Sequence, residues 1–142
     1  MRRLAVLLGL AAIGAAPPPS GEVVVAVDGL RSAKGLVQAC LTAKPKAFPD
    51  CRRDPASRRL TVRADDTGAL RFAALPSGRY AVSLLHDENA NGRPDMALLL
   101  PREGFGFSRD APVRFGPPKF ARAAFSVGGG SVAMPIRMRY LL

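Results

Sequence analysis

The residues best suited to chemistry form a short loop rich in acids and amides. Oxygen-bearing side chains stand at alternate positions, Asp87, Asn89 and Asn91, and a further carboxylate follows at Asp95. Alternating oxygen ligands in a tight loop can surround a hard cation, and Ca²⁺ prefers such ligands. The spacing predicts a Ca²⁺ site formed by Asp87, Asn89, Asn91, the carbonyl of Arg93, and Asp95.

The same loop has a second interpretation that needs no metal. Asp and Asn side chains commonly accept hydrogen bonds from the backbone amides of a turn. The twelfth position of the loop, where an EF-hand has a bidentate Glu, is Leu98. With so few carboxylates, a Ca²⁺ site here is expected to be weak, with a dissociation constant on the order of 10⁻⁴ to 10⁻³ M. The sequence leaves the weak Ca²⁺ site and the metal-free capped turn as alternatives.

The only histidine, His86, directly precedes this loop. A catalytic histidine needs a nucleophile within hydrogen-bond reach. Ser83 lies on the opposite face of the same predicted strand, so it cannot serve. We therefore expect His86 to be a structural hydrogen-bonding residue and the protein to have no enzymatic activity.

The first residues have the pattern of a secretory signal peptide. Basic residues open the chain, an apolar stretch follows, and small residues end residues 1–16. The apolar stretch is too short to span a bilayer as a helix. We predict a signal peptide at 1–16, a proline-rich spacer at 17–21 and one domain at 22–142. The mature chain is then periplasmic or extracellular and has no transmembrane span.

Cys40 and Cys51 are the only cysteines of this chain. In an exported protein, two cysteines are expected to form a disulfide. Closing a loop of this size would stabilise the fold by somewhat under about 3 kcal/mol. Zinc binding is not expected, because no further Cys or nearby His completes a tetrahedral set.

Alternating apolar residues predict the strands that position these groups. The apolar face of one strand comprises Tyr80, Val82 and Leu84, and an earlier strand is expected to point Leu70, Phe72 and Ala74 inward. Pro135 suggests an edge position for the last strand. The predicted strands lie near 22–28, 36–41 (antiparallel to the first), 59–64, 70–74, 80–86, 121–127 and 132–140. About seven short strands without a convincing helix predict an all-β, antiparallel Greek-key sandwich of the immunoglobulin type.

Residues 101–120 have no regular period, yet they hold four of the seven phenylalanines. A long aperiodic segment in a small domain either functions or covers the core with its own aromatic residues. The rings are therefore either plugs on the sandwich or ligand contacts. In the second case, the contact residues are expected to be Phe105, Phe107, Phe115, Arg109 and Arg114.

The chain of 142 residues carries a formal charge of +10. Its arginines are scattered, so the excess charge favours loose association with anionic surfaces. A general bias of the composition towards Ala, Arg, Gly and Pro, as a G+C-rich genome produces, would give the same scattered arginines without an anionic partner. Nucleic acid is not expected as a partner, because no basic stripe or recognised nucleic-acid-binding motif is present.

Several motifs, in order, resemble an uncharacterised bacterial exported family known as domain of unknown function 2141. They lie at 68–82, 86–95, 103–108 and 115–118. The Leu-Pro-Ser-Gly-Arg-Tyr segment within the first is also similar to transthyretin-like and collagen-adhesin B-type sandwiches. The resemblance implies a β-sandwich and no particular activity.

Two function classes follow from the sequence. The first is an exported, non-enzymatic binding or structural module of the cell envelope with an unknown ligand and a weak Ca²⁺ site at 87–95. The alternative is a basic protein that binds lipopolysaccharide or another anionic envelope polymer.

Overall fold

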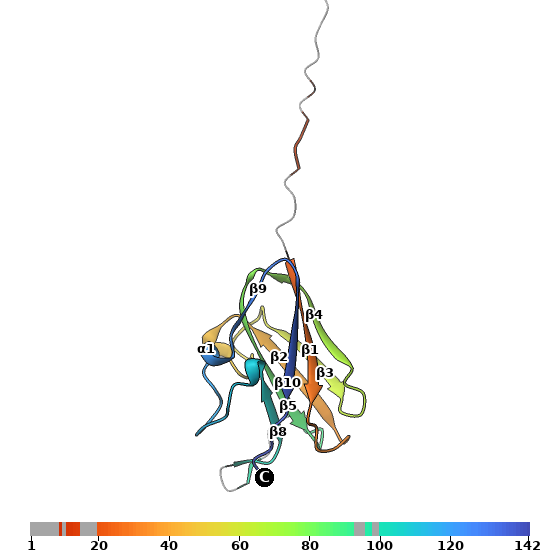
Figure 1. Cartoon of the computed structure of the whole chain (residues 1–142), viewed down its shortest axis with the longest axis vertical. Coiled ribbons are helices and arrows are strands. Elements are labelled where there is room, and N and C mark those ends of the chain that lie inside the picture. Colours follow the sequence, from red (N-terminus) through yellow and green to blue (C-terminus); the bar gives the residue numbers. More distant parts are fainter. Residues whose placement is uncertain (1–8, 10, 15–19, 93–95, 98–99) are drawn as a thin grey trace, which may run out of the picture.

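The computed structural model describes residues 9, 11–14, 20–92, 96–97 and 100–142. Two β-sheets lie face to face and form the body of the domain (Figure 1). One sheet has the order β10-β1-β4, with bounds Ser131–Arg137, Ser20–Asp28 and Ala69–Pro76. The other has the order β3-β2-β5-β8, with bounds Arg58–Arg63, Leu36–Thr42, Gly78–Asp87 and Gly104–Phe107. This architecture confirms the predicted all-β sandwich.

Short elements complete the fold. β9 (Phe125–Val127) pairs with the first residues of β5, and β6 (Met96–Ala97) pairs with β7 (Leu100–Pro101). The helical segments are η1 (Pro45–Ala47), η2 (Ser108–Asp110) and α1 (Phe120–Ala123). In the described part of the chain, no helix has the length and apolar character that a bilayer crossing requires. The predicted signal peptide and spacer lie largely outside the described residues, so both stay predictions.

Strand pairing differs from the sequence prediction in two respects. β1 and β10 run parallel, with Val25 opposite Met134, whereas the other strand pairs are antiparallel. Parallel pairing needs a long connection between the strands, and nearly the whole domain separates these two. In addition, β2 lies in the opposite sheet from β1 instead of beside it. Pro135 does lie on an edge strand, as predicted, because β10 pairs only with β1 in its sheet.

The core lies between the two sheets. Side chains at alternate positions of each strand point inward and exclude water, which is the main favourable term in folding. Tyr80, Val82 and Leu84 are buried there, as predicted, and β1 contributes Val23 and Val25 from the facing sheet. These contacts hold β5 against the three-stranded sheet.

One inward residue was predicted wrongly. Ala74 is exposed, and its neighbour Leu75 is buried instead. Ala74 has a φ of 54°, and the ladder to β1 shifts here by one extra residue on β4. A bulge of this kind reverses the alternation of side chains, so the period-two pattern fails beyond it.

The outer face of the second sheet is partly covered. A smaller cluster comprises Ala81 of β5, Phe107 of β8 and Ala123 of α1. Phe48 packs against them from residues 43–57, the segment between β2 and β3 that contains Cys51, which we call the disulfide loop. The rings of Phe48 and Phe107 meet edge to face, with centroids 5.8 Å apart. This cover extends over one half of the face, and β5 is therefore buried on both sides there.

Gly35 lies in the link between β1 and β2, and Gly68 lies in the turn before β4. The two glycines allow a matched test of how closely the link packs against the end of β5. Both have positive φ, 72° and 52°, but a Cβ at Gly35 would overlap the carbonyl oxygens of Asp87 and Glu88, while nothing lies near Gly68. Gly68→Ala should cost about 1 kcal/mol for the left-handed backbone alone. Gly35→Ala should cost about 1 to 3 kcal/mol more through overpacking, as measured by urea unfolding. Equal losses for the two variants would contradict the close approach at Gly35.

Candidate ligand-binding groove

A groove of about 570 Å³ lies on the uncovered half of the same sheet face. Ligand pockets in proteins usually have volumes of about 300 to 1,000 Å³, so the size suits a small ligand. We call it the outer groove and define it by seven of the residues that line it: Gln38, Asp50, Arg52, Arg59, Thr61, Leu85 and Phe105. Four strands and the disulfide loop thus contribute to one site.

Strand register places the floor of the outer groove. Gln38 on β2 lies opposite Thr61 on β3 and opposite Leu85 on β5, and Leu85 lies opposite Phe105 on β8. Neighbours in a ladder share one face of the sheet. Val37 is buried in the core, so Gln38, the next residue, must face outward. The floor therefore runs from polar side chains on β3 and β2 to half-buried apolar ones on β5 and β8.

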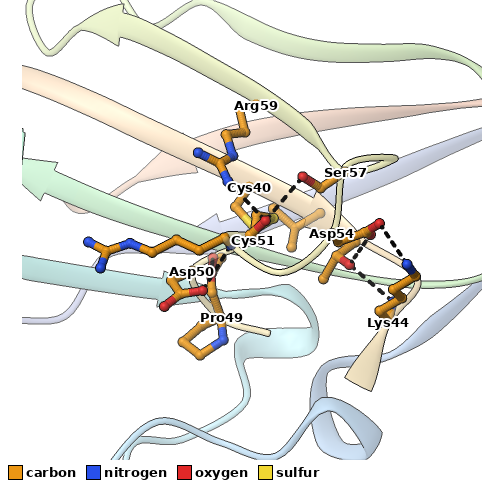
Figure 2. The surroundings of a disulfide bond; sticks show 12 residues. Cys40, Lys44, Pro49, Asp50, Cys51, Asp54, Ser57 and Arg59 are labelled. Atoms are coloured by element: carbon orange, nitrogen blue, oxygen red, sulfur yellow. Dashed lines mark hydrogen bonds and ion pairs between the residues drawn. A yellow bond between two sulfur atoms is a disulfide. The ribbon is translucent and has the colours of Figure 1, made fainter. Parts of the chain in front are cut away.

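The disulfide loop forms one wall. Cys40 of β2 is bonded to Cys51, which confirms the predicted disulfide, and their Cα atoms lie 6.0 Å apart. The guanidinium of Arg59 donates to the carbonyl of Cys51 at 2.9 Å, and the hydroxyl of Ser83 donates to the carbonyl of Pro49 (Figure 2). The wall is thus fastened to β2, β3 and β5.

Asp54 fastens the loop from within. Its buried carboxylate accepts hydrogen bonds from the Thr42 hydroxyl at 2.7 Å and from the Ala56 amide at 3.0 Å, and Lys44 lies 3.5 Å away (Figure 2). The Thr42 hydrogen bond lowers the pKa of Asp54; burial opposes this, while Ala56 and Lys44 add to the lowering. The charged carboxylate therefore contributes to the stability of the loop.

Charge in the outer groove is mixed but includes two guanidinium groups. Asp50 accepts the backbone N–H of Arg52 at 3.0 Å, which fixes the carboxylate against its own loop. Arg59 uses one of its N–H groups in the hydrogen bond to the Cys51 carbonyl, and its other N–H groups can still donate to a ligand. The guanidinium of Arg52 has no hydrogen-bond partner among the described residues. An anionic group entering beside the apolar floor would therefore meet available donors.

Three of the predicted Ca²⁺ ligands, Asp87, Asn89 and Asn91, lie in the described turn. The carboxylate of Asp87 is fully buried and accepts the backbone N–H groups of Asn91 at 3.2 Å and Gly92 at 2.7 Å. It also accepts the side-chain amide of Gln38, and Asn89 accepts the N–H of Asn91. These are the bonds of the capped turn.

The other two predicted ligands, Arg93 and Asp95, lie outside the described residues. The complete Ca²⁺ set therefore stays a prediction. Within the described turn, a cation would have to compete with backbone amides for the Asp87 carboxylate.

His86 makes its hydrogen bonds within the fold. It is fully buried, with Nε2 2.8 Å from the carbonyl oxygen of Lys34 and Nδ1 2.7 Å from the hydroxyl of Tyr140. A carbonyl only accepts, so Nε2 carries a proton and donates it to the Lys34 carbonyl. Burial raises the pKa of Tyr140, so this hydroxyl keeps its proton.

The predicted aromatic and arginine contacts fall into separate places. Phe107 is buried in the smaller cluster and is a plug. Phe105 is half-buried at the end of the outer groove. Phe115 is fully exposed on a loop away from the groove, and Arg109 and Arg114 are also exposed. Of the five predicted contact residues, only Phe105 lines the outer groove, and the ligand contacts themselves stay a prediction.

Most of the outer groove was missed from the sequence, including Gln38, Thr61 and Leu85. A signal was present in β5, where the outward positions Ala81, Ser83 and Leu85 are small or apolar instead of charged. Outward apolar residues on a strand indicate a covered or binding face. Which of the two applies at each position depends on where the disulfide loop lies, and spacing alone does not give this.

Comparison with known proteins gives one family. The family described as "Uncharacterized protein conserved in bacteria (DUF2141)" matches residues 25–135, a span that contains both sheets and the outer groove apart from the first residues of β1 and the last of β10. No curated protein and no solved structure shows significant similarity to the chain.

Asp87 provides a test that separates the capped turn from the metal site. Asp87→Asn leaves one acceptor oxygen for three N–H groups and should lower the free energy of unfolding by about 1 to 3 kcal/mol. Because the loss comes from the cap, it should be the same in Ca²⁺ and in chelator, as followed by thermal melting. A wild-type midpoint that rises with millimolar Ca²⁺, and a rise that Asp87→Asn abolishes, would support the metal site instead.

Asp54 predicts an acid-sensitive loop. A lowered pKa in the folded state means that the carboxylate stabilises the fold above its ordinary pKa, and this contribution is lost as pH falls through the folded-state value. Asp54→Asn should therefore be about 1 to 3 kcal/mol less stable than the wild type at neutral pH. The gap should shrink below about pH 4. The exposed Asp65→Asn is the control, and a gap independent of pH would contradict the prediction.

Proposed function

The chain belongs to DUF2141, a family of uncharacterized proteins conserved in bacteria, and we propose that it is an exported, non-enzymatic binding module of the cell envelope. Its ligand occupies the outer groove. The family description assigns no activity, so the proposal depends on the chemistry of this chain.

One observation carries the proposal: the outer face of the second sheet is covered only in part. The disulfide loop, α1 and η2 bury Ala81 and Phe107, whereas the outer groove leaves Leu85 and Phe105 half-buried at its base. Apolar side chains at the base of a concave site favour ligand binding, because a ligand removes them from water.

The lining predicts the ligand chemistry. Leu85 and Phe105 suit an apolar face, and Arg52 and Arg59 suit a carboxylate or phosphate at the opposite wall. Gln38 donates its amide to Asp87, which leaves the amide oxygen as an acceptor for a hydroxyl group. A small anionic ligand with one apolar face matches this arrangement.

Export is supported by two features of the chain. The predicted signal peptide at 1–16 would direct the protein across the membrane. The disulfide between Cys40 and Cys51 is of the kind that persists in oxidising compartments.

A non-enzymatic role is supported by the state of the reactive side chains. Both ring nitrogens of His86 are engaged, and Cys40 and Cys51 are joined to each other. The described residues that line the outer groove therefore offer groups that can bind a ligand, and none of them is a nucleophile activated by His86 or by a free cysteine.

The alternative function, binding of polyanions by dispersed arginines, receives less support. Arg31, Arg63 and Arg71 form ion pairs with Glu88, Asp65 and Glu22. These three arginines are thus paired locally, while the formal net charge stays at +10, so the support for this alternative is general charge attraction alone.

Thr61 allows the groove to be blocked without disturbing the core, because it is exposed on β3. A panel of sugar acids, their neutral sugars and short fatty acids would be tested by thermal shift and by NMR titration. An anionic member should bind the wild type, and Thr61→Trp, which adds bulk without charge, should weaken its binding at least about tenfold, or about 1.4 kcal/mol.

Ser77→Trp is the matched control, since it adds the same side chain at an exposed turn. It should bind as the wild type does. Equal affinity in Thr61→Trp and wild type would place the ligand elsewhere and contradict the proposed groove.

A further inference from the structure

Phe115 is the most exposed large apolar side chain within the folded domain. Its relative exposure is 113 %, whereas the terminal residues Leu141 and Leu142 reach 47 % and 50 %. It also has a φ of 51°, a region that bulky residues rarely adopt. An aromatic residue that is strained and fully hydrated lowers stability, so its presence indicates a function outside the fold.

The loop that carries Phe115 is anchored at both ends. Ala111 and Pro118 are buried, and Phe120 packs edge to face on Phe48 with centroids 6.2 Å apart. At the tip, the N–H of Arg114 donates to the carbonyl of Gly116 at 3.2 Å. The segment projects to the left of the sheets in Figure 1. The ring is therefore held out from the body by a fastened turn.

Positive charge surrounds this tip. Residues 111–124 contain Arg114, Lys119 and Arg122 and no acidic residue. Lys46 of the disulfide loop lines a shallow depression together with Lys119, and all four side chains are exposed. An exposed aromatic ring among cations is the arrangement that suits the boundary between lipid headgroups and acyl chains.

We propose that residues 113–119 dock on the surface of an anionic phospholipid bilayer. Phe115 inserts at the level of the upper acyl chains, while Arg114, Lys119 and Lys46 lie among the phosphates. A soluble polyanion would use the cations alone and would leave the ring in water. This surface is separate from the outer groove. Membrane docking through Phe115 would therefore hold even if no ligand binds in the outer groove.

The chain contains no tryptophan, so Phe115→Trp places a single fluorescent reporter at the tip. Vesicles of phosphatidylcholine, with or without phosphatidylglycerol, are the probes. With phosphatidylglycerol present, the emission should shift to the blue and be quenched by brominated acyl chains. High salt should reverse the shift, because the cations are screened. Unshifted emission on anionic vesicles would overturn the inference.

Vesicle sedimentation measures the contribution of each part. Phe115→Ala should weaken binding to anionic vesicles at least about tenfold, from the loss of a buried apolar side chain. Arg114→Ala should weaken it about fivefold, the usual contribution of one cation near an anionic membrane. Both residues are exposed, and unchanged melting temperatures would confirm that the fold is intact.

Two controls match these variants. Leu141→Ala removes another exposed apolar side chain, and Lys34→Ala removes an exposed cation on the β1–β2 link. Neither should change binding by more than about twofold, since charge away from the contact is screened. Equal losses for Lys34→Ala and Arg114→Ala would indicate general charge attraction and overturn the inference. Undiminished binding of Phe115→Ala to anionic vesicles would do the same.

Discussion

The fold depends on one strand, β5, being buried on both of its faces. It pairs with β2, β8 and β9, so both of its edges are occupied. Its inward residues, Val82 and Leu84 among them, fill the space between the sheets. Its outward residue Ala81 lies under the smaller cluster. Where β5 is covered on both faces, as at Ala81 and Val82, successive residues are apolar, because neither face meets water there.

The cover over β5 is what creates the outer groove. The disulfide loop would be free to move over the sheet if it were held only at its ends, but it is bonded at Cys40 and packed through Phe48. Asp54 binds it further to Thr42 of β2. Since the loop is fixed over one half of the face, the other half stays open with Leu85 exposed to a ligand. The position of the groove is therefore a consequence of how the loop is fastened.

Local features of the sequence predicted local features of the structure. The alternation in Tyr80, Val82 and Leu84 gave the correct inward face, because one buried face imposes period two on a strand. Two cysteines gave the correct disulfide. Features that depend on contacts between distant residues were not predictable in the same way. The bulge at Ala74 and the parallel pairing of β1 with β10 depend on the partner strand, about which the residue types of β4 and β10 carry little information.

The groups that looked most chemical in the sequence are those that the fold itself uses. Asp87 holds the turn and a side chain of β2. Burial raises the pKa of Glu88, but hydrogen bonds from Arg31 and Ser32 outweigh it and lower the pKa, so this carboxylate holds the β1–β2 link while charged. Arg31 in turn lies 4.4 Å from the ring centre of Tyr140, whose hydroxyl reaches the buried histidine. A buried polar group must be satisfied within the protein or it destabilises the fold. Side chains whose hydrogen bonds are all made within the protein have little capacity left to bind a ligand. Recognition is therefore expected where the fold leaves apolar side chains in contact with water. These places are the floor of the outer groove and the exposed ring of the 113–119 loop.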